Sequence, residues 1–417
     1  MSDLPRVAYL TSLYPAASHT FILREVTALR DLGFDVVTCS VRRPGPTHLI
    51  GPEEEAAHNS TFYVIEAGKN PVRMLQAIAE GLASPARFLE ALKLARRTAP
   101  PGLKGTLKQL AYFAEGLVLS GHLRAQGVQH LHTHFADPPA HVAMLTAALS
   151  GIPFSYTLHG PAEIYEPNTW CLREKTAEAA FVACISHFCR SQAMYFSDPA
   201  HWDKLHIIHC GVIPERYESD PPKSKAPGTN LVFVGRLTPI KGLRVLIEAF
   251  AAAHATRPDL TLTLVGDGDD RAHLEAMAAP LGDAVQFLGF QSQQGVADAL
   301  AAADALVLPS FAEGLPVVLM EALAAGKPVI CTQLAGVGEL VEDGVSGFVV
   351  PASDAEALTA RIHDMAKDPA RRAEMGARGR EKVRAEFDVR HEAARIGALF
   401  AGTHDGKIRP DPLKRPS

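Results

Sequence analysis

The chain has 417 residues, which is too long for one ordinary hydrophobic core, so its length predicts two domains. Hydrophobic residues make up 47% of the sequence and charged residues 21%, a composition typical of a globular protein and not of a disordered or fibrous one. The formal net charge of −5 argues against a nucleic-acid-binding protein, because such proteins usually carry a basic excess over a whole domain.

Neither an export signal nor a membrane span is expected from the sequence. Met1 to Thr11 contains only the short apolar run Val7 to Leu10, which is too short for the core of a signal peptide. No run reaches the roughly 18 apolar residues that a helix needs to cross a bilayer. We therefore expect a cytoplasmic protein. The six cysteines are scattered and form no C-x-x-C pair, which indicates reduced thiols and neither a zinc module nor a disulfide framework.

Short β-rich apolar runs alternate with helical patterns along the chain. This alternation predicts an α/β fold of two doubly wound, Rossmann-like domains, each with a parallel sheet covered by helices on both faces. The predicted strands of the first half are 6–11, 34–39, 62–65, 130–134, 154–158, 181–186 and 205–208. Those of the second half are 231–235, 261–266, 285–289, 305–308, 329–332 and 348–350.

Composition predicts the domain boundaries. Residues 213–229 hold four prolines together with lysine and glycine, a composition suited to a linker. We expect a first domain over residues 1–212 and a second over 230–385. A helix over 386–401 can pack back on the first domain, and residues 402–417 are expected to be a disordered tail because they have little apolar content.

Residues 69–110 have a different character from their surroundings. They carry eight lysines and arginines but only two acidic residues, and apolar positions (Leu75, Ile78, Leu82, Phe88 and Leu92) recur at helical spacing. Two interpretations stay open. Basic amphipathic helices can lie on an anionic membrane, such as the inner face of the cytoplasmic membrane, or they can pack their apolar face inward and present a solvated basic face.

In the second half, Gly235 and Arg236 directly follow a predicted strand, and Lys241 precedes the next helix. Both cations should therefore lie at the carboxyl end of a parallel strand, where open α/β sheets bind ligands. A guanidinium and a mobile ammonium suit a diphosphate. A pair of ordinary surface cations is the alternative.

The run from Glu313 to Glu321 predicts two carboxylates around the start of a short helix. Gly314 and Pro316 indicate a tight turn, with Glu313 before the helix and Glu321 about two turns into it. The two carboxylates can bind hydroxyls at opposite ends of a nucleotide sugar, and the N–H groups of Gly314 and Leu315 can face a phosphate. A buried Glu321 paired with an arginine is the alternative.

These motifs resemble retaining glycosyltransferases of family 4, which have the two-domain GT-B fold. Their donor half carries G-R-L-x-x-x-K-G, then a strand ending in G-D-G, then E-x7-E, which correspond here to Gly235–Gly242, Gly266–Gly268 and Glu313–Glu321. The resemblance spans nearly the whole chain. It implies that the two domains face each other across a cleft, that residues 1–212 form the acceptor-binding domain, and that residues 230–385 form the nucleotide-sugar-binding domain. It implies that Arg236 and Lys241 hold the diphosphate, that Glu313 binds the sugar hydroxyls, and that Glu321 binds the ribose. The resulting donor-binding set is Gly235, Arg236, Lys241, Gly266, Glu313, Gly314, Leu315, Pro316 and Glu321.

Motifs of the first half resemble the branch that builds bacterial exopolysaccharides, including the colanic acid transferases. They are Ser18-His19-Thr20-Phe21-Ile22-x-x-Glu25, His132 to Ala136, and Thr157 to Gly160. The resemblance implies that His159 touches the donor sugar; a core histidine is the alternative. We place Ser18, Thr20 and His134 on the acceptor side. Much of the wider family has a Gly-Gly pair after the first strand, whereas this chain has Pro15-Ala16-Ala17-Ser18.

Other sites are less well supported by the sequence. His130, His132 and His134 share one face of a strand, a pattern that permits a metal site, but we expect no metal. Asp267-x-Asp269 imitates a metal-binding D-x-D motif, yet it lies in a loop of the second half. Gly266-x-Gly268 is not a dinucleotide fingerprint, because Arg271 occupies the third glycine position.

We therefore predict a retaining hexosyltransferase with His159, Arg236, Lys241 and Glu313 as its catalytic residues. It needs no cofactor or metal. Its expected substrates are a nucleotide-diphosphate sugar and a glycan acceptor linked to polyprenyl diphosphate at the inner membrane surface. Two alternatives remain: a non-catalytic two-domain sugar-binding protein, and a phosphorylase or epimerase of the same shape.

Overall fold

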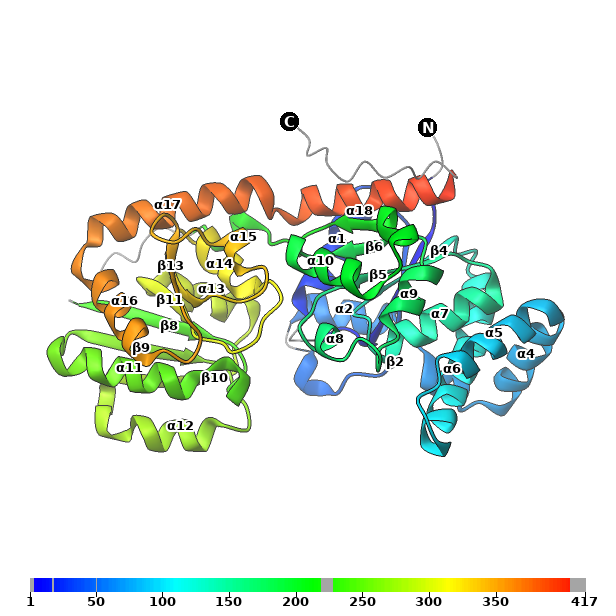
Figure 1. Ribbon diagram of the computed structural model, residues 1–417, viewed down its shortest axis with the longest axis horizontal. Helices are drawn as coiled ribbons and strands as arrows, with labels where there is room; N and C mark the ends of the chain where they lie inside the picture. Colours follow the sequence, from blue (N-terminus) through cyan, green and yellow to red (C-terminus); the bar gives the residue numbers. More distant parts are fainter. Residues whose placement is uncertain (1–3, 17–18, 50, 219–227, 406–417) are drawn as a thin grey trace. The chain divides into compact units, whose positions relative to one another are not determined.

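The computed structural model describes residues 4–16, 19–49, 51–218 and 228–405. The chain divides into two compact units (Figure 1). The first unit contains Met1–His209 and Glu392–Ser417, and the second contains Cys210–His391. Each unit has one sheet, and every strand pairing in both sheets is parallel. The predicted α/β class is thereby confirmed.

The first sheet has seven strands in the order β3-β2-β1-β4-β5-β6-β7. Its order reverses at β1, which has β2 on one side and β4 on the other. Open α/β sheets bind ligands at such a reversal, beyond the carboxyl ends of the strands. The strands are β1 (Val7–Leu13), β2 (Val36–Arg42), β3 (Phe62–Tyr63), β4 (His130–His134), β5 (Phe154–Leu158), β6 (Val182–Cys184) and β7 (Leu205–Ile207).

Local sequence signals set the helices of the first unit. In α7 (Pro138–Ser150), Asp137 is the N-cap, proline stands at the first position, and Gly151 ends the helix at φ 78°. The other helices are α1 (Thr20–Asp31), α2 (Pro52–Ser60), α3 (Val64–Gly68), α4 (Pro71–Leu82), α5 (Pro85–Arg97), α6 (Leu103–Ala125), α8 (Ala162–Tyr165), α9 (Leu172–Glu178), α10 (His187–Phe196) and α18 (Val389–His404), with short 3₁₀ turns η1 (Pro46–His48) and η2 (Pro199–Lys204).

The second sheet has six strands in the order β10-β9-β8-β11-β12-β13, which reverses at β8. Its strands are β8 (Thr229–Val234), β9 (Leu260–Val265), β10 (Val285–Gly289), β11 (Ala305–Leu308), β12 (Val329–Thr332) and β13 (Gly347–Val350). The helices are α11 (Leu243–Thr256), α12 (Arg271–Ala278), α13 (Gln293–Ala302), α14 (Val317–Ala324), α15 (Val337–Leu340), α16 (Ala355–Lys367) and α17 (Pro369–Glu386), with η3 (Pro214–Tyr217), η4 (Pro239–Lys241) and η5 (Ala279–Ala284).

The structure differs from the linker expected over 213–229. Part of that stretch forms η3, which packs against α14 in the second unit, and Tyr217 is only 2% exposed. The division between the units falls after His209, earlier than the expected boundary at 212. Because the aromatic side chain of Tyr217 is buried, this part of the stretch packs with the second unit and is not an open linker. The proline-rich composition gave no indication of that burial. Residues 219–227 lie outside the described part of the chain.

The C-terminal helix α18 joins the first unit. The ring centroid of Phe400 lies 4.9 Å from that of His130 and 5.6 Å from that of Phe181. The guanidinium of Arg395 donates to the carbonyl of Ile207 at 2.6 Å. This helix starts later than the expected 386–401, because α17 continues to Glu386, and it reaches His404 inside the expected tail. Of that tail, residues 406–417 lie outside the described part.

The helices expected within 69–110 are α4, α5 and the start of α6. They pack on one another and on α7. The inward interpretation of their apolar stripe is wrong at three positions, since Leu75 is 67%, Leu82 53% and Leu92 38% exposed, while Ala77 and Leu94 are buried. None of the helices in the described ranges combines the length and the low polarity that a bilayer-crossing helix requires.

Candidate functional site

The turns after β8 and β9 touch at a point that admits only glycine. Gly266 has φ +134°, and a Cβ there would lie 1.9 Å from the carbonyl oxygen of Gly235. The N–H of Leu237 also donates to the carbonyl of Asp267 at 2.9 Å. A side chain on Gly266 would force the two turns apart. The glycines therefore hold the segment after β8 at the reversal of the second sheet.

A second close contact joins the segments after β8 and β11, the strands that flank the reversal. Gly242 has φ +65°, and a Cβ there would lie 2.0 Å from the carbonyl oxygen of Pro309. The N–H of Phe311 donates to the carbonyl of Ile240 at 2.8 Å. Side chains from the two segments are thus brought to one place.

Lys241 and Glu313 are those side chains. The Nζ atom of Lys241 lies 2.6 Å from Oε1 of Glu313, and the two side chains are 17% and 13% exposed. The Ser310 hydroxyl donates to the same carboxylate oxygen at 2.6 Å. A partly buried ammonium and carboxylate at this edge of the sheet offer a cation and a hydrogen-bond acceptor side by side.

Glu321 is buried in α14, with 8% of the residue exposed. The helix starts only at Val317, so Glu321 lies within its second turn. This is slightly nearer the helix start than the two full turns predicted from the sequence. The Tyr217 hydroxyl donates to Oε1 of Glu321 at 2.7 Å. This tyrosine is one observed partner of the carboxylate, where an arginine was the alternative expected from the sequence.

The remaining donor-site residues surround these pairs. Arg236 lies in the turn after β8 and is exposed. Gly314, Leu315 and Pro316 are buried before α14, and the carbonyl of Gly314 accepts the N–H of Gly336 at 3.1 Å. In the described residues, no hydrogen bond or ion pair links Arg236 to Lys241, Glu313 or Glu321. The structure therefore groups Lys241 with Glu313, and Glu321 with Tyr217.

The reversal of the first sheet carries a chain of buried hydrogen bonds. The Tyr9 hydroxyl, from β1, donates to Oε1 of Glu25 at 2.6 Å, and the Nε2 atom of His134 lies 3.2 Å from the same oxygen. The Nδ1 atom of His134 lies 3.0 Å from Nε2 of His159. The four residues are buried. His134 and His159, predicted separately, are thus in direct contact.

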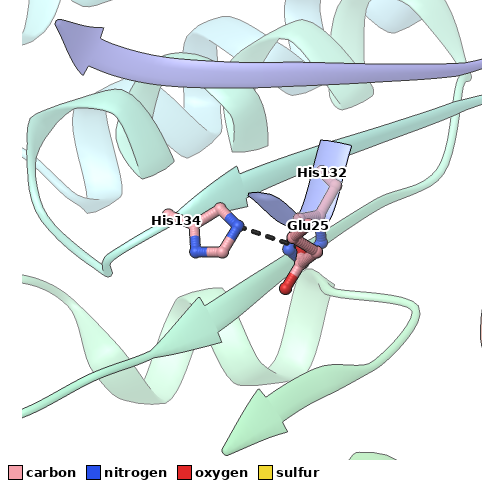
Figure 2. Close-up of side chains that lie close together, drawn as sticks. All are labelled: Glu25, His132 and His134. Carbon is pink, nitrogen blue, oxygen red and sulfur yellow. Dashed lines mark hydrogen bonds and ion pairs between the residues drawn. The ribbon is translucent and has the colours of Figure 1, made fainter. Parts of the chain in front are cut away.

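A second chain runs beside the first. The imidazole nitrogens of His132 lie 2.8 Å from the Ser155 hydroxyl oxygen and 3.0 Å from that of Thr157. His132, His134 and Glu25 offer ligand atoms that all lie within 4.8 Å of one another, and Figure 2 shows the three side chains gathered at the strand. Hydrogen bonds already occupy both nitrogens of His132, so the cluster has partners without an ion.

Burial keeps the rings of His130, His132 and His159 neutral at ordinary pH. It lowers the pKa of His159 and of His132 well below the usual value, and neighbouring histidines add to the effect. The pKa of His130 falls to about 3 for the same reason. Burial raises the pKa of Tyr9, and Glu25 raises it further. The tyrosine therefore remains a hydrogen-bond donor.

Glu163 of α8 ties together the loops that follow β4 and β5. Its carboxylate accepts the N–H of His159 at 3.0 Å and also the N–H of Ala136. The ammonium of Lys175 donates to the carbonyl of Ala136. Burial raises the pKa of Glu163 to about 8 and lowers that of Lys175 to about 7. This buried pair fixes the backbone that carries His134 and His159.

Of the other residues expected on the acceptor side, Thr20 is the first residue of α1 and is partly exposed. Ser18 lies outside the described residues. Sequence reasoning missed Tyr9, Ser310 and Tyr217 and gave Glu25 no role. A signal existed for Glu25, since an acid between buried Ile22 and Val26 on an apolar helix face requires a polar partner.

Comparison with known proteins places these features in a family. Residues 18–216 match the family described as Glycosyltransferase Family 4, and residues 217–382 match the one described as Glycosyl transferases group 1. The chain belongs to the family 4 glycosyltransferases. The two matched regions together span most of the chain.

Two curated relatives extend over nearly the whole chain. The amylovoran biosynthesis glycosyltransferase AmsK of Erwinia amylovora is 28% identical over 92% of this chain and 96% of its own length. The putative colanic acid biosynthesis glycosyltransferase WcaL of Salmonella typhimurium is 28% identical over 95% of this chain and 99% of its own. The crystal structure of Anabaena HepE in complex with UDP matches with a TM-score of 0.72 at 19% identity, covering 95% of this chain and 100% of that one. The predicted GT-B fold is confirmed.

Proposed function

We propose that this glycosyltransferase moves a hexose from a nucleoside diphosphate sugar to a lipid-linked saccharide during exopolysaccharide or cell-surface glycan synthesis, with retention of anomeric configuration. The observation that carries the proposal is the pair of Lys241 and Glu313 at the reversal of the second sheet. The names of AmsK and WcaL support the pathway class, and the UDP in the HepE structure supports a nucleotide donor.

In this proposal, charge stabilisation of the leaving group drives the reaction. Arg236, Lys241 and the N–H groups of Gly314 and Leu315 bind the diphosphate, whose negative charge grows as the glycosidic bond breaks. Glu313 binds the sugar hydroxyls and Glu321 the ribose hydroxyls.

His159 contacts the sugar from the first unit. No side chain of the donor site is assigned as a covalent nucleophile. The acceptor hydroxyl therefore attacks on the face that the diphosphate leaves and passes its proton to the departing diphosphate, so that the configuration is retained. The reaction needs no bound metal, because the cations of the protein supply the positive charge.

A donor screen tests this function. The purified protein is incubated with UDP- and GDP-sugars and glycan acceptors, and nucleoside diphosphate release and product anomer are measured. Arg236→Ala and Lys241→Met should each lower kcat by roughly 100-fold, or about 3 kcal/mol, as loss of one charge-stabilising group does. Arg244→Met is the matched control, since Arg244 is exposed and paired with Asp270 at 2.6 Å.

The outcomes separate the alternatives. Normal turnover by Arg236→Ala contradicts the proposal. Release that requires added phosphate identifies a phosphorylase, a change in the sugar without transfer identifies an epimerase, and binding without turnover identifies a sugar-binding protein.

The surface of α4, α5 and the start of α6 supports a membrane-bound acceptor. Exposed large apolar residues gather there among the basic residues of 69–110. Exposed apolar side chains can be buried in the boundary region of a bilayer, and the neighbouring cations are attracted to anionic lipids. Both effects favour binding of this surface to an anionic membrane over exposure to water. We define this as the α4–α6 leucine surface; it comprises Val72, Leu75, Leu82, Leu89, Leu92, Leu103, Leu107 and Leu110.

Vesicle binding tests the membrane proposal. Neutralising Arg87, Lys93, Arg96 and Arg97 together should weaken binding to phosphatidylglycerol vesicles at least tenfold, since each cation contributes about 1 kcal/mol near an anionic surface. The double variant Leu103→Ser, Leu107→Ser should weaken binding to neutral vesicles as well. Leu288→Ser in β10 is the control, because it removes a 46% exposed leucine from the second unit. Unchanged binding by both test variants contradicts a membrane role.

A further inference from the structure

We propose that the rings of Tyr112 and Trp170 form an aromatic platform on the first unit that binds one sugar ring of the acceptor, with Lys108 as its cation. The inference deepens the proposed function and rests on it in one respect, because it takes the acceptor to be a saccharide. Lys108 and Tyr112 lie on α6, and Trp170 precedes α9 in the same unit.

One cation contacts both rings of the platform. The Nζ atom of Lys108 lies 5.7 Å from the ring centroid of Tyr112 and 5.9 Å from that of Trp170. An ammonium at such a distance is attracted to the faces of aromatic rings. Lys108 is exposed, and both rings are partly exposed. Two aromatic side chains and an ammonium are therefore accessible at one place.

A buried histidine supports both parts of the platform. The ring of His141 stacks on Tyr112, with centroids 5.5 Å apart and 14° between the ring planes. It also forms a hydrogen bond with the backbone of Thr169, the residue before Trp170. His141 is only 3% exposed, and burial lowers its pKa to about 2, so the ring is neutral. Such support orients the platform before a ligand arrives, which reduces the entropic cost of binding.

Two carboxyl groups lie beside Tyr112. Burial, and then the charges of Glu115 and Asp137, raise the pKa of this phenol to about 12. Within the described ranges, Oε2 of Glu115 and Oδ1 of Asp137 are buried without a hydrogen-bond partner, as is Nδ1 of His141. Asp137 is the N-cap residue of α7, yet its side chain makes no capping hydrogen bond. Unpaired buried polar atoms are uncommon in folded proteins, so both carboxyl groups have capacity to accept a hydrogen bond from a ligand.

This combination of groups suits a sugar ring. A pyranose has C–H groups on its faces, which pack on aromatic rings, and hydroxyls at its edge. Each hydroxyl both donates and accepts hydrogen bonds. The ammonium of Lys108 donates, and the carboxyl groups of Glu115 and Asp137 accept. A phosphate ligand fits less well, because it has no hydrogens for the two carboxyl groups and is repelled by them once they ionise.

The position of the platform on α6 assigns it to a lipid-linked saccharide. Lys108, Tyr112 and Glu115 recur at i, i+4 and i+7, so they share one face of the helix. Leu103 and Leu107 of the α4–α6 leucine surface belong to the same helix. From Leu103 to Glu115 the helix extends about 18 Å. A saccharide whose lipid lies at the leucine surface can therefore pass the platform.

The other end of the platform lies near the carboxyl edge of the first sheet. Asp137 comes three residues after the end of β4, and open α/β sheets bind ligands beyond such strand ends. The platform uses none of the acceptor-side residues Ser18, Thr20 and His134. We therefore assign it to a sugar that lies between the lipid and the sugar that receives the hexose, so the acceptor has at least two sugar residues.

Saccharide binding tests the inference without a donor or turnover. The full-length protein is applied to an array of α- and β-linked gluco-, galacto- and manno-oligosaccharides of one to four rings, and the affinity for the best ligand is measured by titration calorimetry. Trp170→Leu should bind roughly tenfold more weakly, whereas Trp170→Phe, which keeps an aromatic face, should stay within about threefold. Tyr195→Leu is the control, because it removes a 78% exposed tyrosine from α10 of the same unit.

Two further substitutions test the polar groups. Lys108→Met should weaken binding roughly fivefold, and Lys104→Met, which removes the same charge one turn earlier on α6, should not. Glu115→Met should weaken binding roughly tenfold while urea unfolding at pH 8 shows no loss of stability, because the ionised carboxylate is itself unfavourable there. A purely structural carboxyl group would change stability and leave the affinity unaltered.

Each outcome decides for or against the platform. Loss of affinity in Trp170→Leu and Lys108→Met, with normal affinity in Trp170→Phe and Lys104→Met, supports it. Absence of binding to every saccharide of the array overturns it, and so does equal affinity of Trp170→Leu, Lys108→Met and the unmodified protein. If Trp170→Leu does not fold, the two lysine variants decide. A failure of the proposed function would appear differently, as saccharide binding at the platform without transfer from any donor.

Discussion

Removing the ion pair of Lys241 and Glu313 in two steps should separate its structural role from its chemical role. At 2.6 Å the pair has a Coulomb energy of about 6 kcal/mol for an effective dielectric constant near 20. Loss of hydration opposes much of this energy, since both side chains are largely buried. We expect a coupling energy of about 2 kcal/mol for the pair, within the range measured for close charge pairs.

Lys241→Met leaves the Glu313 carboxylate with the Ser310 hydroxyl but without its cation. The second unit should lose about 2 kcal/mol of stability, and turnover should fall roughly 100-fold. Adding Glu313→Gln removes the uncompensated charge. The double variant should regain most of the lost stability, and its turnover should stay low because the diphosphate cation is still missing.

Urea unfolding can locate this effect within the chain. Trp170 and Trp202 are the two tryptophans, and both belong to the first unit. Far-UV circular dichroism reports both units, whereas tryptophan fluorescence reports the first. The changes should therefore appear in the dichroism transition and leave the fluorescence transition unmoved. The reasoning is refuted if the stability losses of the two single substitutions add in the double variant, or if the double variant regains turnover.

Three further changes test other parts of the structure. Burial raises the pKa of Glu115 to about 7, so its ionisation destabilises the folded state progressively as pH rises from 4.5 to 7. Glu115→Gln should therefore gain about 2 kcal/mol at pH 8, allowing for partial solvent exposure, and nothing at pH 4, as measured by urea unfolding followed by fluorescence. Gly242→Ala should cost at least about 2 kcal/mol in dichroism-detected unfolding, because its Cβ would overlap the carbonyl of Pro309 in a left-handed backbone; a normal transition contradicts the close contact. Tyr217→Phe removes a 2.7 Å hydrogen bond to Glu321 worth about 1 kcal/mol, so donor KM should rise roughly fivefold with kcat unchanged. An unaltered KM argues against ribose binding by Glu321.

The sheets could be predicted from sequence because most of the strands are buried on both faces. Such strands appear as short apolar runs, and all thirteen of the predicted runs contain strands, although several ends differ by one to three residues. Turn chemistry was equally local: Gly235 and Gly266 stand where two turns touch. A local sequence pattern does not show which distant residues contact each other in the folded chain. The pairing of Lys241 with Glu313 joins residues 72 positions apart.

The buried partners of the site were missed for the same reason. Glu25 and His134 are 109 positions apart, and Tyr217 and Glu321 are 104 apart, so no local pattern links them. Tyr217 also lay in a stretch whose prolines suggested a linker. Helical periodicity identified the helices within 69–110, but it does not state which face meets protein. Leu75 is exposed because α4 packs through small residues such as Ala77.

The return of the chain to the first unit has a consequence for biosynthesis. Residues 210–391 are continuous, whereas the first unit needs both the start of the chain and Phe400, whose ring packs against His130 and Phe181. A ribosome therefore completes the second unit before the first has all of its core. Domains usually mature in the order of their synthesis. Here the second unit is complete before the first. The core of the first unit stays incomplete until α18, which carries Phe400, has been synthesised.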